Sequence, residues 1–340
     1  MSGFQGSLSE GECVLPEVAS WLRRRTSTAE DWPSHVLLAA KGASGISVVL
    51  PARDEEATVG DIVACIRRDL VRRVPLVDEI VVIDSRSTDR TAEVARAAGA
   101  RVVAQDSVLP ALGRMSGKGE ALWKSLAVTS GDIIVFVDAD LRDFTSSYVT
   151  GLLGPLLTDP SVGYVKACYD RPLVDGERSV EGGGGRVTEL VARPLINMHW
   201  PLLAGVMQPL GGEYAGRRAL LERLPFVTGY GVEIGLLVDV YRDSGLDAIA
   251  QVDLGRRVHS HQTTEALGAM SGQIMVTAWS RLERHGRIMP LSAPSTALTQ
   301  FRRSADGHDA RTADMAVGER PPMREVPGYA SSRPVTPGRR

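Results

Sequence analysis

Cysteine is scarce in this 340-residue sequence, which contains only Cys13, Cys65 and Cys168. The number is odd and no Cys-x-x-Cys spacing occurs, so both a disulfide framework and a zinc site are disfavoured. A protein with few, scattered cysteines is typical of a reducing compartment. We therefore expect a cytoplasmic location.

Long apolar runs are also missing. Nowhere do 18 uninterrupted apolar residues occur, so the sequence predicts no transmembrane span. The N-terminal segment is acidic and has no basic stretch followed by an apolar run, so no secretory signal is predicted either. The expectation is a protein without stable membrane insertion.

The sequence has no excess of charge of either sign. It contains 39 Lys and Arg against 41 Asp and Glu, a formal net charge of -2. Binding to nucleic acid usually depends on a basic surface that neutralises phosphates, and this composition provides no such overall field. We therefore expect no nucleic-acid partner. The apolar content of 43% and charged content of 24% are ordinary for a globular protein.

Two common nucleotide-binding motifs are absent from the first strand–helix unit. Residues 46–50 form a compact apolar run that predicts a strand, and apolar residues at helical spacing over 59–70 predict a helix. The turn between them reads Pro-Ala-Arg-Asp-Glu-Glu over 51–56, without the glycines of a dinucleotide fold or a P-loop. A dehydrogenase and a P-loop NTPase are therefore disfavoured. The carboxylates could receive the base and ribose of a nucleotide sugar, or only complement the helix dipole.

The stretch 132–140 indicates where a ligand binds. Five consecutive residues, Ile133 to Val137, are β-branched or aromatic, which predicts a strand buried on both faces of a covered parallel sheet. Asp138 and Asp140 follow at its carboxyl end, the edge at which open α/β sheets bind ligands. Two desolvated carboxylates repel each other, so the pair favours a divalent cation that holds a diphosphate. Taken alone, the aspartates could also begin a turn and cap a helix.

Two further predicted strands place polar residues at the same edge. Residues 79–84 predict a strand that ends in the polar turn 84–89, and residues 100–104 predict a third strand. The turn Gly-Lys-Gly over 117–119 then opens a helix over 121–129. Backbone amides and a cation at a helix start suit a phosphate, although turns of this composition are common.

The second half of the sequence contains a candidate anion site. A glycine run over 182–185 precedes Arg186 and Thr188 at the predicted start of a helix. Backbone amides, a guanidinium and a hydroxyl at that place can hold an anion by charge-assisted hydrogen bonds. The alternative is that the glycine run is only a flexible linker.

Later segments offer carboxylates and imidazoles. The glycine-rich segments 210–215 and 229–235 let the backbone approach a sugar closely, and they contain Glu213 and Glu233. The segment 258–261, Val-His-Ser-His, presents two imidazoles on the same side of a predicted extended strand. Histidines in such a position are either structural or metal ligands.

Four of these motifs occur in an order that resembles the nucleotide-sugar domain of GT-A glycosyltransferases. They are the segments 50–56, 84–89, 117–119 and 138–140. With the Gly-Gly-Arg-Val-Thr segment, residues 46–285 resemble the glucosyl-3-phosphoglycerate synthases and their mannosyl relatives. The resemblance implies an α/β protein with a GT-A fold, in which a Rossmann-like, mostly parallel sheet is flanked by helices and fused to an acceptor-binding half.

The resemblance also implies a reaction. It predicts a hexosyltransferase that moves glucose from UDP-glucose to the 2-hydroxyl of D-3-phosphoglycerate with retention of configuration. The predicted cofactor is Mg²⁺, with Mn²⁺ or another divalent ion as alternatives, and the predicted assembly is a homodimer.

The site residues follow from the matching motifs. Asp138 and Glu233 are predicted to act at the reacting sugar, and Asp140 and His259 to bind the metal. The predicted acceptor-binding residues are Gly185, Arg186 and Thr188. The predicted donor-binding residues are Pro51, Ala52, Arg53, Glu55, Ser85, Lys118, Asp138, Ala139, Asp140, Leu210 and Gly211.

Departures from the family pattern leave alternatives open. Arg53-Asp54 stands where mycobacterial members have Leu-Asn, Arg86 replaces a glycine, Ala139 replaces a serine and His261 replaces an asparagine. The first two changes lie beside the predicted base and ribose pocket, so a mannosyl-3-phosphoglycerate synthase that uses GDP-mannose remains an alternative. A polyprenyl-phosphate glycosyltransferase and a non-catalytic nucleotide-sugar sensor are less favoured. The first would require an apolar C-terminal anchor, which this sequence does not predict. The second conflicts with the presence of Asp138, Asp140, His259 and Glu233.

The sequence predicts four parts. Residues 1–44 form an N-terminal helical arm, residues 45–145 the nucleotide-sugar-binding half, and residues 146–290 the acceptor-binding half with the metal histidine and a C-terminal helix. Proline, serine, arginine and aspartate dominate residues 291–340 without periodicity, so this segment is predicted to be a disordered tail.

Overall fold

A mixed eight-stranded sheet forms the centre of the part of the chain that the computed structural model describes. The described residues are 14–170, 173–175, 178–180, 185–256, 263–305 and 307–329. In spatial order the strands are β1 (Thr26–Thr28), β11 (Ile249–Arg256), β6 (Tyr164–Asp170), β9 (Tyr214–Arg217), β5 (Ile133–Phe136), β2 (Ile46–Ala52), β3 (Glu79–Asp84) and β4 (Arg101–Ala104).

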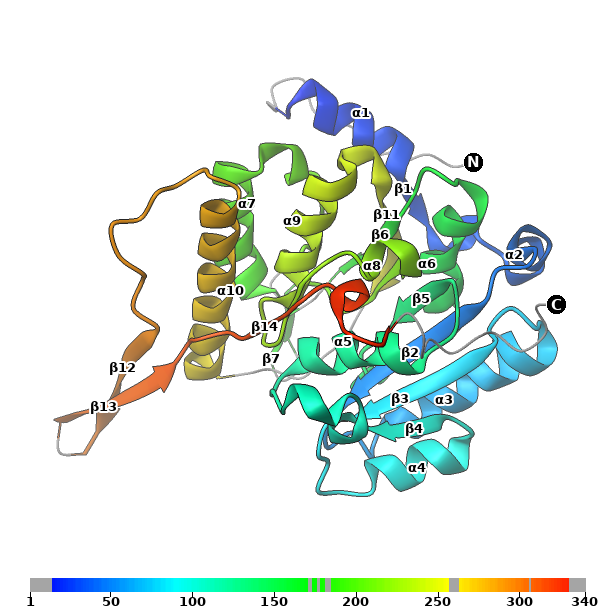
Figure 1. Cartoon of the computed structure of the whole chain (residues 1–340), viewed down its shortest axis with the longest axis horizontal. Helices are drawn as coiled ribbons and strands as arrows, with labels where there is room; N and C mark the ends of the chain where they lie inside the picture. Colours follow the sequence, from blue (N-terminus) through cyan, green and yellow to red (C-terminus); the bar gives the residue numbers. More distant parts are fainter. Residues whose placement is uncertain are drawn as a thin grey trace.

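Helices surround this sheet (Figure 1). They are α1 (Pro16–Arg25), α2 (Ser34–Lys41), α3 (Val59–Ile66), α4 (Thr91–Ala98), α5 (Lys118–Val128), α6 (Ser147–Thr158), α7 (Arg193–His199), α8 (Arg218–Leu221), α9 (Val232–Ser244) and α10 (Thr264–Arg284). Two π-helical stretches, η2 (Arg67–Arg73) and η5 (Thr188–Ala192), continue α3 and precede α7. Among the described residues, no helix combines the length and the apolarity that a bilayer crossing requires.

The prediction of an α/β fold with a mostly parallel sheet is confirmed. Every strand of the large sheet pairs in parallel with its neighbours except β9, which runs antiparallel to both β5 and β6. The prediction that 133–137 lies between parallel neighbours is therefore wrong on one side. An apolar run indicates that a strand is buried on both faces. It does not indicate the direction of the neighbouring strand, because parallel and antiparallel neighbours allow the same burial.

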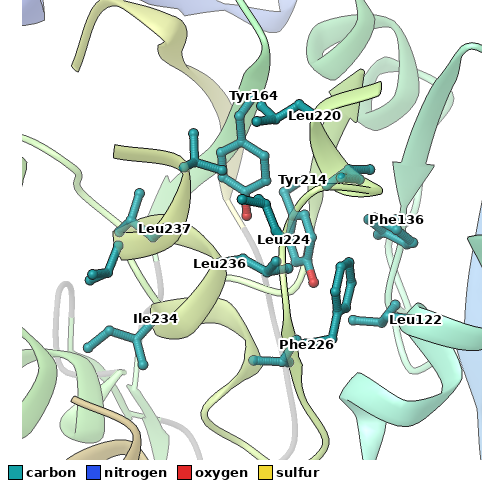
Figure 2. Close-up of a cluster of buried hydrophobic side chains, with 14 of the residues drawn as sticks. Leu122, Phe136, Tyr164, Tyr214, Leu220, Leu224, Phe226, Ile234, Leu236 and Leu237 are labelled. Atoms are coloured by element: carbon teal, nitrogen blue, oxygen red, sulfur yellow. The ribbon is translucent and has the colours of Figure 1, made fainter. Parts of the chain in front are cut away.

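The sheet is buried on both faces, as the alternation along β2 demonstrates. Val49 belongs to one apolar cluster, whereas Val48 and Leu50 belong to another. Because successive side chains of a strand point to opposite faces, the two clusters lie on opposite sides of the sheet. Figure 2 shows part of the first cluster, in which the Tyr214 ring lies 5.1 Å from the Phe136 ring between centroids.

Paired strands within residues 297–320 contradict the prediction of a disordered tail for that part of 291–340. Strands β12 (Ala297–Ser304) and β13 (Gly307–Asp314) form a hairpin that extends away from the body at the lower left of Figure 1. Strand β14 (Glu319–Arg320) then pairs with β10 (Phe226–Val227) on the body itself. A third small sheet consists of β7 (Leu173–Asp175) and β8 (Arg178–Val180).

Polar contacts hold the returning segment, which explains why hydrophobic periodicity did not predict it. Arg320 is 5% exposed and donates to both carboxylate oxygens of Glu120 at 2.8 Å. The indole of Trp123 donates to the carbonyl of Pro321, and the Thr228 amide donates to the carbonyl of Gly318. Such long-range contacts leave no pattern in the local sequence.

Candidate active site

A cavity of about 690 Å³ opens at the carboxyl edge of the sheet. Its size lies within the range of small-molecule sites in proteins. Most of the predicted site residues form its wall. They are Pro51, Ala52, Arg53, Glu55, Ser85, Lys118, Asp138, Ala139, Asp140, Gly185, Arg186, Thr188, Leu210 and Glu233.

Two predicted residues are not among those that line the cavity. Gly211 does not line the cavity, whereas its two neighbours Leu210 and Gly212 do. His259 lies outside the described residues, as does His261. The carboxylate of Glu213 is fully buried and accepts a hydrogen bond from the Tyr169 hydroxyl at 2.7 Å.

The acidic turn after β2 separates into structural and cavity-facing residues. Asp54 adopts a φ of 57° and accepts a hydrogen bond from the Thr88 amide at 2.7 Å. Glu56 accepts a hydrogen bond from the Arg90 amide at 3.0 Å. These two carboxylates therefore brace the turn after β3. Glu55, which lies between them, lines the cavity.

The pKa of Glu55 is raised to about 7, first because the side chain is partly buried and then because Asp140 and Asp138 are negatively charged. Three carboxylates thus face one region of the cavity. Oxygen ligands of this kind suit Mg²⁺ or Mn²⁺, and a cation would remove the repulsion that raises this pKa. The residues present therefore fit a divalent ion, although the described residues alone contain no group of three or more metal-ligating side chains.

Binding of a metal nucleotide should release a proton from Glu55. A cation near Asp140 reverses the electrostatic cause of the raised pKa, so the pKa falls toward its usual value and the carboxyl loses its proton. Affinity for UDP with Mg²⁺ should therefore increase as pH rises toward 7 and level off above it. Calorimetry at about pH 6 in buffers of different ionisation enthalpy measures the released proton.

The terminal phosphate of UDP can release a proton as well, so Glu55→Gln is the control for this prediction. The variant should release fewer protons than the wild type under the same conditions. Equal proton release by both proteins would contradict the assignment to Glu55.

Lys118 connects the two predicted catalytic carboxylates. Its ammonium forms an ion pair with Asp138 and another with Glu233, the latter at 3.0 Å. Burial alone would lower the pKa of Lys118, but Asp138 and Glu233 raise it above its usual value. Lys118 therefore carries a positive charge beside both carboxylates and faces the cavity, where a phosphate could accept from it.

Close packing accounts for the glycines on either side of Lys118. Gly117 has a φ of 109°, a backbone conformation that favours glycine. A Cβ atom at Gly117 would collide with the carbonyl of Thr228, and one at Gly119 with the carbonyl of Val227. The amide of Gly119 donates to the Thr228 carbonyl at 3.1 Å. The turn is thus pressed against the end of β10, which fixes the start of α5 at the cavity.

The predicted acceptor residues lie on the opposite half of the chain and reach the same cavity. Gly185 has a φ of 74°, and its carbonyl accepts from the amide of Glu189 as the helical stretch begins. Thr188 is 2% exposed, whereas Arg186 is exposed. A guanidinium and a hydroxyl at a helix start can hold a phosphate or carboxylate.

Several cavity residues were not predicted. Gln105 directly follows β4, so the strand-end rule that identified Asp138 could have found it. Its side-chain oxygen accepts from the Ser85 hydroxyl at 2.8 Å. The guanidinium of Arg86 donates two hydrogen bonds to the carboxylate of Asp106, at 2.9 and 3.0 Å. Four further lining residues, Gly117, Gly212, Gly229 and Tyr230, belong to segments predicted to approach a phosphate or a sugar. The other lining residues are Ser116, Val187, Leu267, Met270, Gln273 and Ile274.

Comparison with known families and relatives places this cavity in context. Residues 47–204 match the family model described as glycosyl transferase family 2. The chain is 48% identical over 303 residues to the glucosyl-3-phosphoglycerate synthase of Mycolicibacterium smegmatis. That match covers 89% of this chain and 97% of the relative.

Two solved structures are similar over most of the chain. Mannosyl-3-phosphoglycerate synthase from Rubrobacter xylanophilus matches with a TM-score of 0.84 and 39% identity, over 91% of this chain and 99% of that one. Glucosyl-3-phosphoglycerate synthase from Mycobacterium tuberculosis, in complex with Mn²⁺, UDP-glucose and phosphoglyceric acid, matches with a TM-score of 0.76 and 48% identity. This second match covers 86% of this chain and 95% of that one.

Proposed function

This chain belongs to the glucosyl-3-phosphoglycerate synthase family, and we propose that it transfers glucose from UDP-glucose to the 2-hydroxyl of D-3-phosphoglycerate, with retention and with a divalent metal ion. One observation carries the proposal. A single cavity joins the acidic and lysine-bearing strand ends to Arg186 and Thr188. A nucleotide sugar and an anionic acceptor can therefore meet inside it.

The charge of each side chain determines which part of the donor it can bind. Asp140 and His259 would hold the metal ion, with Asp138 in support. A bound ion would neutralise the charge that develops on the departing UDP. Lys118, which faces the cavity, can donate to the phosphates, and Asp138 and Glu233 can accept hydrogen bonds from hydroxyls of the sugar.

Arg186 and Thr188 orient the acceptor. Their cationic and hydroxyl groups face the cavity from the second half of the chain and bind the phosphate and carboxylate of phosphoglycerate. Fixing this molecule beside the donor turns a bimolecular encounter into an oriented one. The 2-hydroxyl oxygen then bonds to the anomeric carbon on the face from which UDP leaves, while the bond from that carbon to UDP breaks and the hydroxyl proton passes to the departing diphosphate. Attack and departure on the same face retain the configuration of the sugar.

Two measurements test the proposal: product formation with different acceptors, and activity with and without a divalent metal ion. Purified protein with UDP-glucose and Mg²⁺ should form glucosyl-3-phosphoglycerate from D-3-phosphoglycerate, and D-glycerate, which lacks the phosphate, should be a poor acceptor. A chelator should stop the reaction, and added Mg²⁺ or Mn²⁺ should restore it. Equal use of both acceptors, or full activity with chelator, would remove the basis of the proposal.

Arg186→Ala should raise the KM for phosphoglycerate by about 10- to 100-fold, because charge-assisted hydrogen bonds contribute about 1.5–3 kcal/mol. The KM for UDP-glucose should change little. Initial-rate kinetics with each substrate varied in turn measures both values. Arg96→Ala, an exposed arginine on α4 that does not line the cavity, is the matched control. An unchanged KM for phosphoglycerate would remove Arg186 from the acceptor site.

The mannosyl alternative has a specific observation in its favour. The mannosyl-3-phosphoglycerate synthase structure matches with a TM-score of 0.84, compared with 0.76 for the glucosyl enzyme complex. Arg86, held by Asp106, lines the cavity near the predicted base pocket and can influence the choice of nucleotide. Identity nevertheless favours the glucosyl enzymes, at 48% against 39%.

We further propose that the protein forms a homodimer. The β12–β13 hairpin projects from the body and carries Phe301, whose side chain is 71% exposed, and Leu291 upstream is fully exposed. An interface that covers the hairpin would bury both side chains, and contiguous exposed apolar surface marks such interfaces. Light scattering after size exclusion should find a dimer for the wild type and a monomer for Phe301→Asp with Leu291→Asp. Met198→Asp, an exposed apolar residue elsewhere, should stay dimeric. A monomeric wild type would contradict this proposal.

A further inference from the structure

A buried lysine lies behind the cavity wall that Leu210 and Gly212 form. Lys166 on β6 is 0% exposed, and its ammonium donates a hydrogen bond to the carbonyl of Gly211. The same ammonium lies 4.8 Å from the centre of the Tyr214 ring, which belongs to the apolar cluster in Figure 2. Within the described residues Lys166 forms no salt bridge.

Fold stability does not explain a lysine at this place. Burial lowers the pKa of Lys166 to about 7, although Glu233 raises it and Lys118 lowers it further. Keeping a proton on a buried amine therefore costs folding free energy at neutral pH. Replacing buried charges by apolar groups of similar volume is often neutral or stabilising. A residue that is costly for folding and adjoins the active site is a candidate for a functional role.

The hydrogen bond from Lys166 sets the orientation of one peptide group. The carbonyl of Gly211 and the amide of Gly212 share a planar trans peptide, so they point in opposite directions. Because the carbonyl points toward Lys166, the Gly212 N–H points away from it. Gly212 lines the cavity and Gly211 does not, so we infer that this N–H points to the cavity side. No described residue accepts a hydrogen bond from it.

Gly212 also lies against the groups proposed to hold the sugar. A Cβ atom at this position would collide with Asp138 and Lys118. Glycine is therefore required for the backbone to come this close to both side chains. The amide of Gly212 and the carboxylate of Asp138 then offer a donor and an acceptor to the same part of the cavity.

We propose that Lys166 is a positioning residue, which holds the Gly211 carbonyl so that the Gly212 N–H donates to a hydroxyl oxygen of the transferred sugar. Asp138 accepts a hydrogen bond from the same hydroxyl, so the hydroxyl is held from two sides. The identity of the ligand as a nucleotide sugar rests on the proposed function above. Binding of the nucleotide part of the ligand does not depend on this peptide group.

The experiment compares Lys166→Met with Lys166→Gln, whose amide can still donate to the Gly211 carbonyl. In Lys166→Met, kcat/KM for UDP-glucose should fall by about tenfold or more, because one oriented hydrogen bond of about 1.4 kcal/mol corresponds to that factor. The affinity for UDP, which lacks the sugar, should stay within about twofold. The melting temperature should be unchanged or higher. Lys166→Gln should recover part of the lost activity.

Lys124→Met is the matched control. Lys124 is equally buried and donates to the carbonyl of Gln105, but it also lies 3.2 Å from Glu120. Lys124→Met should lower the melting temperature. It should change the affinities for UDP and for UDP-glucose by the same factor. Binding of both ligands is measured by calorimetry as well, so the comparison does not depend on turnover.

Two outcomes would overturn the role of Lys166. The first is an unchanged kcat/KM in Lys166→Met. The second is a lower melting temperature with equal losses for UDP and UDP-glucose and no recovery in Lys166→Gln, which would indicate a structural lysine. Failure of the proposed function is distinguishable from both, because the wild type itself would then form no product.

Discussion

Asp140→Ala is expected to lower kcat/KM for UDP-glucose by at least about a hundredfold. Groups that merely support metal ligands contribute about 10- to 100-fold, so a direct ligand should contribute at least as much. Asp140 follows β5 at the carboxyl edge of the sheet and lines the cavity with Asp138 and Glu55. Its loss should also raise the concentration of Mg²⁺ required for half-maximal activity. Metal titrations at fixed UDP-glucose and phosphoglycerate measure this change.

Asp143→Ala is the matched control for Asp140→Ala. Asp143 is an exposed carboxylate three residues further along the chain, and it does not line the cavity. Its variant should keep the activity and the metal requirement of the wild type. Near-normal turnover in Asp140→Ala would disprove the assignment of Asp140 to the metal.

Arg320→Met is expected to lower the free energy of unfolding by about 3 kcal/mol. Removing one partner of a buried ion pair leaves the other charge uncompensated, which typically costs about 3–5 kcal/mol. Glu120 is 0% exposed and loses two hydrogen bonds in this variant. Lys124, 3.2 Å from Glu120, offsets part of the cost, so the lower end of the range is expected. Urea denaturation measures the change.

Two controls separate this ion pair from other effects. Adding Glu120→Gln to Arg320→Met should recover part of the lost stability, because the uncompensated charge is then removed. Arg324→Met alters an exposed arginine of the same segment and should change stability by less than about 0.5 kcal/mol. Equal stability of Arg320→Met and the wild type would contradict the argument that the C-terminal segment is anchored by this pair.

The strand ends that form the cavity were predictable because their chemistry is local. Apolar runs such as 79–84 gave the strand bounds directly, and β3 has those bounds. The polar residue after each run then falls at the same edge of a parallel sheet, which is why Asp138 and Glu55 were found. Gln105, which directly follows the third strand, obeys the same rule.

Other features depend on contacts between distant parts of the chain. The salt bridge of Glu120 and Arg320 joins residues that are 200 positions apart, and no periodicity reports it. Strand β9 is four residues long and contains a glycine, so its antiparallel place between β5 and β6 left no pattern. The orientation of the Gly211–Gly212 peptide depends on Lys166, 45 residues earlier. Such features became visible only in three dimensions.

The most direct test of the account is a comparison of donors. Initial rates are measured with Mg²⁺ and D-3-phosphoglycerate for UDP-glucose, GDP-glucose and GDP-mannose. The account predicts the highest kcat/KM for UDP-glucose, by about tenfold or more, which corresponds to about 1.4 kcal/mol in the transition state. A preference for GDP-mannose would contradict the central claim, because this cavity would then select the mannosyl reaction.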